Sequence, residues 1–259
     1  MIKPILFAFA CAAFITVVIS SGCNQSSSSM MSKAGTYIGE TKVFGSDSIR
    51  SWVKTDDNGN PSSIGVTFKE SAFTALEKDS DLMTMIMLPT MMTGGMMSMM
   101  AIPFDHIEVD WAPNGDPAPT PYDKAHLDCH FITMSMMDQM GMMGGMDTTK
   151  MDMKYMPHGY MSDSMSEEGM GVHCMDTTAK EFHGQPFDHT FVYGFYHGNM
   201  AFMEAMCAKS FLDTKTSTTI NIQQPQAFMK PGYYPLKYSI NYDAIKKEYS
   251  ISLDNLTSH

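Results

Sequence analysis

Short segments of alternating apolar and polar residues recur from residue 36 onward, and they restrict this chain to a fold built mainly of strands. In PFDHIEVDWAP, for example, Ile107, Val109 and Trp111 share one parity, and ionisable residues share the other. Because successive side chains of a strand point to opposite faces, such a segment predicts one apolar and one polar face. We therefore predict a mainly β fold (β-rich α+β): a single barrel- or sandwich-like domain over residues 36–259, with few short helices and a methionine-rich insertion.

The first 22 residues have the features of an export signal. Lys3 precedes an apolar run, and small residues lead to Cys23. This order resembles a bacterial lipoprotein signal, in which the cysteine is lipidated and begins the mature chain, although Ser20 stands where an aliphatic residue is usual. We expect a signal peptide over residues 1–22, lipidation of Cys23 and a flexible tether over residues 23–35. The protein would then be an exported, membrane-anchored lipoprotein of the cell envelope, on the periplasmic or outer-membrane face; a plain secreted protein is the alternative.

The net charge of −11 argues against a nucleic-acid partner, because no basic stripe is present. The sequence contains no acyl-transfer triad, phosphate loop or dinucleotide fingerprint. These observations leave open whether the chain is an enzyme, and they do not fix its oligomeric state.

The segment HLDCHF carries the strongest indication of a metal site. His126, Asp128 and His130 stand two residues apart, so they share one face of a strand. His173 in GVHC and Glu204 in MAFMEAM add a third imidazole and a carboxylate, which together suit a transition metal. We predict that the three histidines and Glu204 form the site, with Asp128 as an alternative ligand or a partner that orients an imidazole. Flat-strand residues four apart are separated by roughly 13 Å, so one histidine stays outside direct coordination unless the strand bends. A polar network without metal is the alternative.

Methionine is concentrated in two segments, residues 83–100 and 134–170. The second has almost no aliphatic residues, which predicts an insertion or mobile flap rather than ordinary core. Thioethers are soft ligands that select Cu(I), and by the same softness Ag(I). The candidate soft ligands are Met140, Met142, Met143, Met146, Met151, Met153, Met156, His158, Met161 and Met165. Adaptable packing and reversible scavenging of oxidants are the alternatives.

Three cysteines remain beyond Cys23, namely Cys129, Cys174 and Cys207. Two of them adjoin candidate ligands, and an exported thiol pair is expected to oxidise. We predict that Cys129 and Cys174 lie close enough for a disulfide; three small buried thiols are the alternative.

Several ordered segments together resemble an uncharacterised bacterial family of unknown function, typified by a hypothetical protein of the TTHB series. They are NGNPSSIGV, DWAPNGDPAP, AHLDCHF, MGVHCMD, YGFYHGNMAFMEAM and QPQAF with GYYPLKYSINYD. The resemblance implies a β-rich fold and matches the family's histidines and glutamate to His126, His130, His173 and Glu204. This chain departs from the family at Cys129 and Cys174, where an aromatic residue is usual, and at Ala205, where proline is usual. The family has no established activity to transfer.

Our leading interpretation is an envelope-anchored protein that binds a metal ion at the His/Glu site and Cu(I) or Ag(I) at the methionine-rich insertion. The runner-up is a metal-dependent enzyme acting on a small molecule, with the methionine-rich segment as a lid. A metal-free binding or interaction protein is the third.

Overall fold

A computed structural model describes most of the region after the expected tether. The described residues are 34–76, 81–89, 91–93, 96–98, 102–117, 120–162 and 164–259. They confirm the mainly β prediction, with 51% of the structure in strands and 12% in helices. Cys23 and residues 1–22 lie outside the described residues. In the part of the chain that the structure describes, no helix is both long and apolar enough to cross a membrane.

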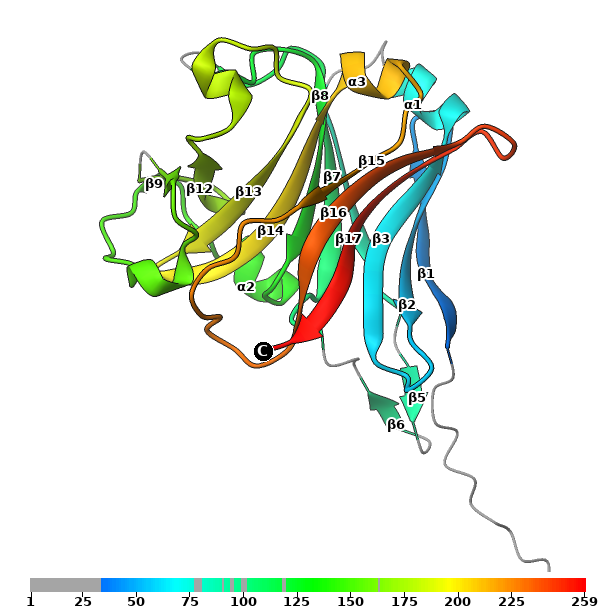
Figure 1. Cartoon of the computed structure of the whole chain (residues 1–259), viewed down its shortest axis with the longest axis horizontal. Helices are drawn as coiled ribbons and strands as arrows, with labels where there is room; N and C mark the ends of the chain where they lie inside the picture. The colour runs from blue at the N-terminus through cyan, green and yellow to red at the C-terminus, as the bar shows by residue number, and fades with distance from the viewer. Residues whose placement is uncertain are drawn as a thin grey trace, which may run out of the picture.

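Two antiparallel sheets form the domain (Figure 1). The first has six strands in the order β1 (Gly35–Phe44), β2 (Asp47–Thr55), β3 (Pro61–Lys69), β17 (Glu248–Ser258), β16 (Tyr233–Asp243) and β15 (Thr218–Asn221). The second has nine in the order β4 (Leu82–Met87), β7 (His106–Ala112), β8 (His126–Ile132), β14 (Asn199–Ala208), β13 (His189–Tyr196), β12 (Gly171–Asp176), β11 (Met165–Glu167) and β9 (Gly145–Met146), with β10 (Tyr160–Met161) paired to β12.

The remaining elements are short. A separate hairpin joins β5 (Met91–Thr93) and β6 (Met96–Ser98). The helices are α1 (Glu70–Leu76), α2 (Met136–Met140), α3 (Lys209–Asp213) and two 3-10 turns, η1 (Met153–Tyr155) and η2 (Lys180–His183). The hairpin between β13 and β14 turns at His197 and Gly198, which both have positive φ, as a two-residue turn of this kind requires.

The main core lies between the two sheets and uses one face of each. Ile107, Val109 and Trp111 of β7 belong to it, together with Ile64 and Ile251 of the first sheet. The predicted parity of β7 is therefore confirmed. The polar parity of β7 and β8 points to the other face of the large sheet, where a second, smaller apolar cluster lies. One face of the large sheet thus packs in the main core, and the opposite face presents the ionisable side chains of β7 and β8.

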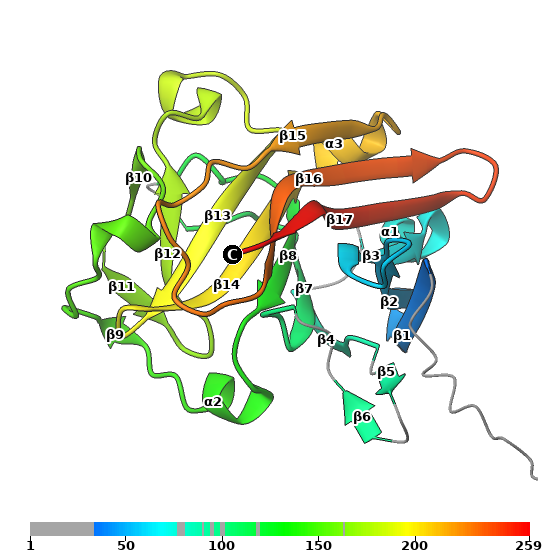
Figure 2. The ribbon, with the colours of Figure 1, turned by 60° about the horizontal axis from the view of Figure 1, so that its bottom comes forward.

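The methionine-rich segment 134–170 packs onto the domain more closely than its composition predicts. Met142 and Met156 are buried in the apolar clusters, which corrects the expectation that this stretch builds no core. The Tyr160 hydroxyl donates a 3.0 Å hydrogen bond to the Phe191 carbonyl and ties the segment to β13. Figure 2 shows β9–β11 gathered around β12, whereas Gln139 of α2 contacts β7. A few buried anchors therefore suffice to attach a stretch with almost no aliphatic residues.

The predicted disulfide between Cys129 and Cys174 is wrong, because both residues are buried thiols. Cys129 lies on β8 and Cys174 on β12, with β14 and β13 between them. Three strand spacings amount to roughly 14 Å, about twice the Cα separation that a disulfide tolerates. Cys129 and Cys174 each adjoin a histidine of the candidate site in the sequence, but this does not make the two cysteines neighbours. The long histidine and glutamate side chains can meet across the strands that separate the cysteines.

Candidate metal centre

Adjacent strands of the large sheet place three ionisable residues in one row. Glu108 of β7 pairs with His130 of β8, and His130 pairs with Glu204 of β14. His173 projects from β12, where it pairs with Gly194 of β13. These residues belong to the polar parity of their strands, so the row lies on the face opposite the main core.

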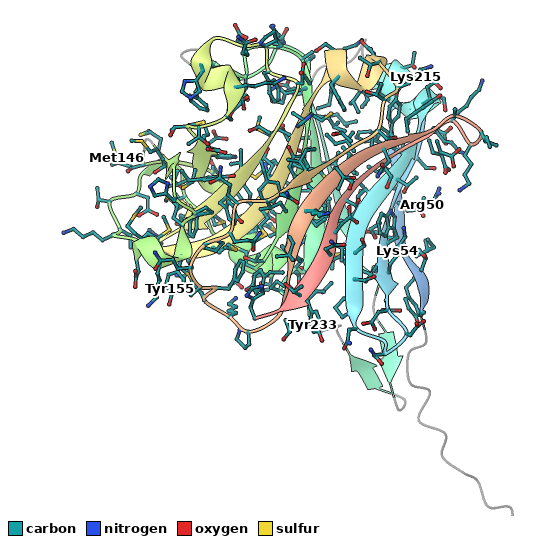
Figure 3. The ribbon with its side chains drawn as sticks, in the orientation of Figure 1. Arg50, Lys54, Met146, Tyr155, Lys215 and Tyr233 are labelled. Carbon is teal, nitrogen blue, oxygen red and sulfur yellow. The ribbon has the colours of Figure 1, made fainter. Side chains whose placement is uncertain are left out.

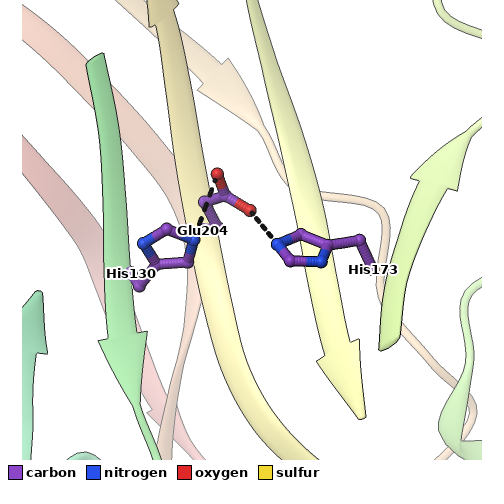
Figure 4. A group of neighbouring side chains, drawn as sticks. All are labelled: His130, His173 and Glu204. Atoms are coloured by element: carbon purple, nitrogen blue, oxygen red, sulfur yellow. Dashed lines mark ion pairs between the residues drawn. The ribbon is translucent and has the colours of Figure 1, made fainter. Parts of the chain in front are cut away.

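His130, His173 and Glu204 form the central group (Figure 4). Glu204 lies between the two imidazoles, with Oε1 3.4 Å from His130 Nε2 and Oε2 3.9 Å from His173 Nε2. The three ligand atoms lie within 4.8 Å of one another. Ligand atoms about 2.1 Å from a tetrahedral ion are separated by roughly 3.4 Å, so only a small closure would bring all three to one ion. These residues could therefore hold a metal ion.

A second group shares His130 with the first. Glu108, Asp110 and His130 also offer ligand atoms within 4.8 Å of one another. His130 Nδ1 lies 3.3 Å from Asp110 Oδ2. Gln139 of α2 donates a 3.0 Å hydrogen bond to Glu108 Oε2, and its own oxygen lies 2.7 Å from His106 Nε2. The methionine-rich segment thus supplies a residue that fixes a carboxylate of the site.

His126 does not join either group, which corrects the predicted four-residue site. It pairs with Ala208, four residues along β14 from Glu204. Its Nδ1 lies 2.6 Å from the Lys124 carbonyl, and its Nε2 lies 3.2 Å from Asp128 and 3.5 Å from Asp116. Asp128 accordingly partners His126 and is not part of the central group. His126 and His130 therefore share a face of β8 but engage different partners.

A cavity of about 510 Å³ opens over the site. Its lining includes His130, His173 and Glu204 with the carboxylates of Asp110, Asp116, Asp128 and Glu167, and among the described residues that line it there is no lysine or arginine. Five of the lining residues each carry a buried polar atom that has no hydrogen-bond partner among the described residues: Asp110 Oδ1, Tyr122 Oη, Asp128 Oδ1, His130 Nδ1 and Glu204 Oε2. Buried polar atoms in proteins are nearly always paired, so this concentration indicates a site for a cation.

Burial and mutual charge hold protons in this site. Burial raises the pKa of Glu204, and burial together with the charge of Asp110 raises the pKa of Glu108. Burial alone would lower the pKa of His130, but the carboxylates of Glu204 and Asp110 outweigh it and raise that pKa. For His126 the carboxylates of Asp116 and Asp128 likewise outweigh burial and raise the pKa to about 11. Positive charge is favoured here, whether a proton or a metal ion supplies it.

Phe202 packs against both histidines of the central group, whose ring centroids lie 6.0 Å apart. Its ring centroid lies 4.9 Å from that of His130 and 5.0 Å from that of His173. The ring has room because the residue opposite is Gly194: a Cβ there would meet Phe202 ring atoms at 2.0 to 2.3 Å. The absence of a side chain at Gly194 therefore leaves room for Phe202, and Phe202 supports both imidazoles.

The predicted soft ligands are divided between the core and the surface. Met142 and Met156 are buried, whereas Met140, Met143, Met146, Met153, Met161 and Met165 are exposed, as is His158, and Met151 is half-buried. Met146 projects away from the domain (Figure 3). Two cross-strand pairs bring thioethers together, Met146 opposite Met165 and Met161 opposite Met175. Met165 also lines the cavity, together with Met170, Met175 and Met206.

The sequence reasoning missed Glu108, Asp110 and Gln139 as site residues. The signal for the two carboxylates was present, because they share the polar parity of β7 with His106. What was missing was the pairing of β7 with β8, which sets Glu108 beside His130. Gln139 carried no signal, because it stands in a stretch of methionine and glycine.

Comparison of the chain with protein-family models, with curated proteins and with solved structures found no match. The resemblance to the uncharacterised bacterial family therefore stays a prediction, and the function is argued from the site alone.

Proposed function

We propose that this protein binds a transition-metal ion through His130, His173 and Glu204. The observation that carries the proposal is the convergence of two imidazoles and a buried carboxylate, with ligand atoms within 4.8 Å, beneath a cavity lined with carboxylates. Glu204 Oε2 supports it, because this buried oxygen has no hydrogen-bond donor among the described residues, which is costly unless a cation approaches. Two imidazoles and one carboxylate are a recurrent ligand set for zinc and related ions.

The test is metal content after purification without chelator. We expect elemental analysis to find a bound first-row transition metal, and a chelated sample to rebind it. His173→Gln removes one ligand from a half-buried position and should weaken rebinding by at least tenfold. His183→Gln is the matched control, because His183 is exposed on η2 and does not line the cavity. Wild-type protein that carries no metal and takes up none would overturn the proposal.

The methionine-rich segment extends the proposal to soft ions. Exposed thioethers, two of them paired across strands, provide ligands that suit Cu(I) and Ag(I). Full-length protein should compete with a Cu(I) chelator, and replacing the exposed Met140, Met143, Met146, Met153 and Met161 by leucine should abolish the competition. Leucine keeps the apolar bulk and removes the sulfur. Undiminished competition by the leucine variant would contradict this role. With the expected lipidation at Cys23, the protein would act as a metal-binding lipoprotein of the cell envelope.

The size of the cavity supports a second candidate, a metal-dependent enzyme. A volume of about 510 Å³ exceeds the needs of one ion, and three protein ligands leave a tetrahedral ion with a position for water or substrate. We expect Co(II)-substituted protein to change its visible spectrum when imidazole is added, because a small neutral ligand can then bind the metal. An unchanged spectrum would indicate a closed site without room for catalysis.

A further inference from the structure

We infer that the site binds two divalent metal ions, one on each ring nitrogen of His130. The inference rests on the proposed function and extends it to a second ion, held by Glu108, Asp110 and His130. Together the two groups would form a dinuclear centre bridged by an imidazole ring.

The first argument is the position of His130 between two sets of carboxylates. Its Nε2 lies 3.4 Å from Glu204 Oε1, and its Nδ1 lies 3.3 Å from Asp110 Oδ2. The two ring nitrogens of an imidazole point away from each other, so one ion cannot bind both. His130 belongs to both groups of three ligand atoms within 4.8 Å, and a different nitrogen contacts a carboxylate of each group.

The second argument is that both sides of the ring have unmet polar atoms. His130 Nδ1 and Asp110 Oδ1 are buried and have no hydrogen-bond partner among the described residues, and the same is true of Glu204 Oε2 on the other side. His130 is 3% exposed and Glu204 1% exposed, so water does not readily satisfy these atoms. One ion on the Glu204 side would leave the Asp110 side unsatisfied.

The third argument is the balance of charge. Asp116 and Asp128 lie beside His126, which leaves three carboxyl groups around His130, those of Glu108, Asp110 and Glu204. As ligands of the two ions they would release any protons that burial holds on them to solvent and carry three negative charges. When the second ion binds, a metal–nitrogen bond replaces the N–H bond at the remaining ring nitrogen, and the proton leaves to solvent. The resulting imidazolate adds a fourth negative charge. Two divalent ions supply the matching four positive charges.

The ligands indicate which ions fit each side. The Glu204 side offers two nitrogens and a carboxylate, which suits Zn²⁺ or Cu²⁺, whereas the Asp110 side offers one nitrogen and two carboxylates, a harder set. Gln139 orients the Glu108 carboxylate through its 3.0 Å hydrogen bond. Metal ligands in proteins are commonly oriented by such hydrogen bonds from residues that do not bind the metal.

The test is the number of ions bound per chain, measured with Zn²⁺ on full-length protein by equilibrium dialysis and elemental analysis. Wild type should bind two ions, and Asp110→Asn and Glu108→Gln should each bind one. Asp123→Asn is the matched control, because Asp123 is exposed and does not line the cavity; it should bind two. Glu108→Gln keeps an oxygen for Gln139, so it provides an answer if the aspartate variant does not fold.

A spectroscopic measurement checks the bridge independently of the count. Protein loaded with two Cu²⁺ ions should show an electron paramagnetic resonance signal weakened by coupling through the ring, and Glu108→Gln should show the full signal of one isolated ion. One ion in wild type and in both variants overturns the second site and leaves the proposed function intact. Two ions in wild type and in every variant would show that the second ion does not bind at Glu108 and Asp110. No ion in any of the proteins would overturn both the proposed metal site and the second site.

Discussion

Replacing Gly194 by alanine tests whether the packing of Phe202 sets the metal site. The new Cβ would lie 2.0 Å from the nearest ring atom of Phe202, whereas ordinary contact begins at 3.4 Å. The ring must therefore shift by about 1.4 Å, the difference between those distances. The φ of Gly194 is not in the left-handed region, so alanine adds bulk without backbone strain.

Overpacking of this kind costs about 1–3 kcal/mol of unfolding free energy. A domain of this size loses about 2–4 °C of melting temperature for each kcal/mol, so thermal unfolding of metal-depleted protein should show a clear decrease. Because the ring contacts both imidazoles, its shift should also displace them and weaken metal binding by about tenfold, which corresponds to about 1.4 kcal/mol.

Two further variants make the result interpretable. Gly194→Ala with Phe202→Leu provides room for the new methyl group and should recover part of the lost stability. Gly144→Ala is the control, because a Cβ there meets nothing closer than 3.4 Å. The reasoning fails if Gly194→Ala unfolds at the wild-type temperature and binds metal with wild-type affinity.

Three more outcomes are expected. Gln139→Leu should lower the unfolding free energy in urea by about 1–3 kcal/mol, because it leaves the buried carboxylate of Glu108 without its donor; wild-type stability would contradict this. An alkylating reagent should label the three cysteines of the described domain only after denaturation, and a reductant should not change the melting temperature; a shift on reduction would show a disulfide. Partial burial opposes ionisation of Glu248, but hydrogen bonds from Lys69 and Arg50 outweigh the burial and lower the pKa of Glu248. Ionised Glu248 therefore stabilises the fold above its unfolded-state pKa, and this stabilisation is lost as the pH falls through its folded-state pKa. Glu248→Gln should therefore lower the unfolding free energy at pH 7, and the loss should shrink as the pH falls below 4.5. A loss that does not change with pH would rule out the ion pairs as the cause.

The sequence predicted the strand faces well because alternation is a local property. The parity of His130 and of Glu204 follows from two neighbouring residues on each side, and the structure places both on the polar face. Which strands lie next to each other is not local. The pairing of β7 with β8 brings Glu108 to the site, and no residue pattern within either strand specifies that partner.

The errors have the same origin. His126 shares the parity of His130, but distance along the strand separates them, and Asp116 from the loop between β7 and β8 engages His126 instead. Cys129 and Cys174 were paired through their neighbours, although two strands lie between them. Composition alone underestimates the methionine-rich segment, because a few residues attach it to the sheet, among them Gln139, Met142, Met156 and Tyr160.

The row of ligands across the sheet also has a consequence for folding. Strands that pair two residues out of register keep every side chain on its proper face, so apolar burial discriminates weakly against such a slip. A slip of two between β8 and β14 would set Phe202 or Met206 opposite His130 in place of Glu204. An ion that needs both His130 and Glu204 binds only the native alignment. Metal present while the sheet assembles would therefore favour the correctly aligned strands over their nearest competitors.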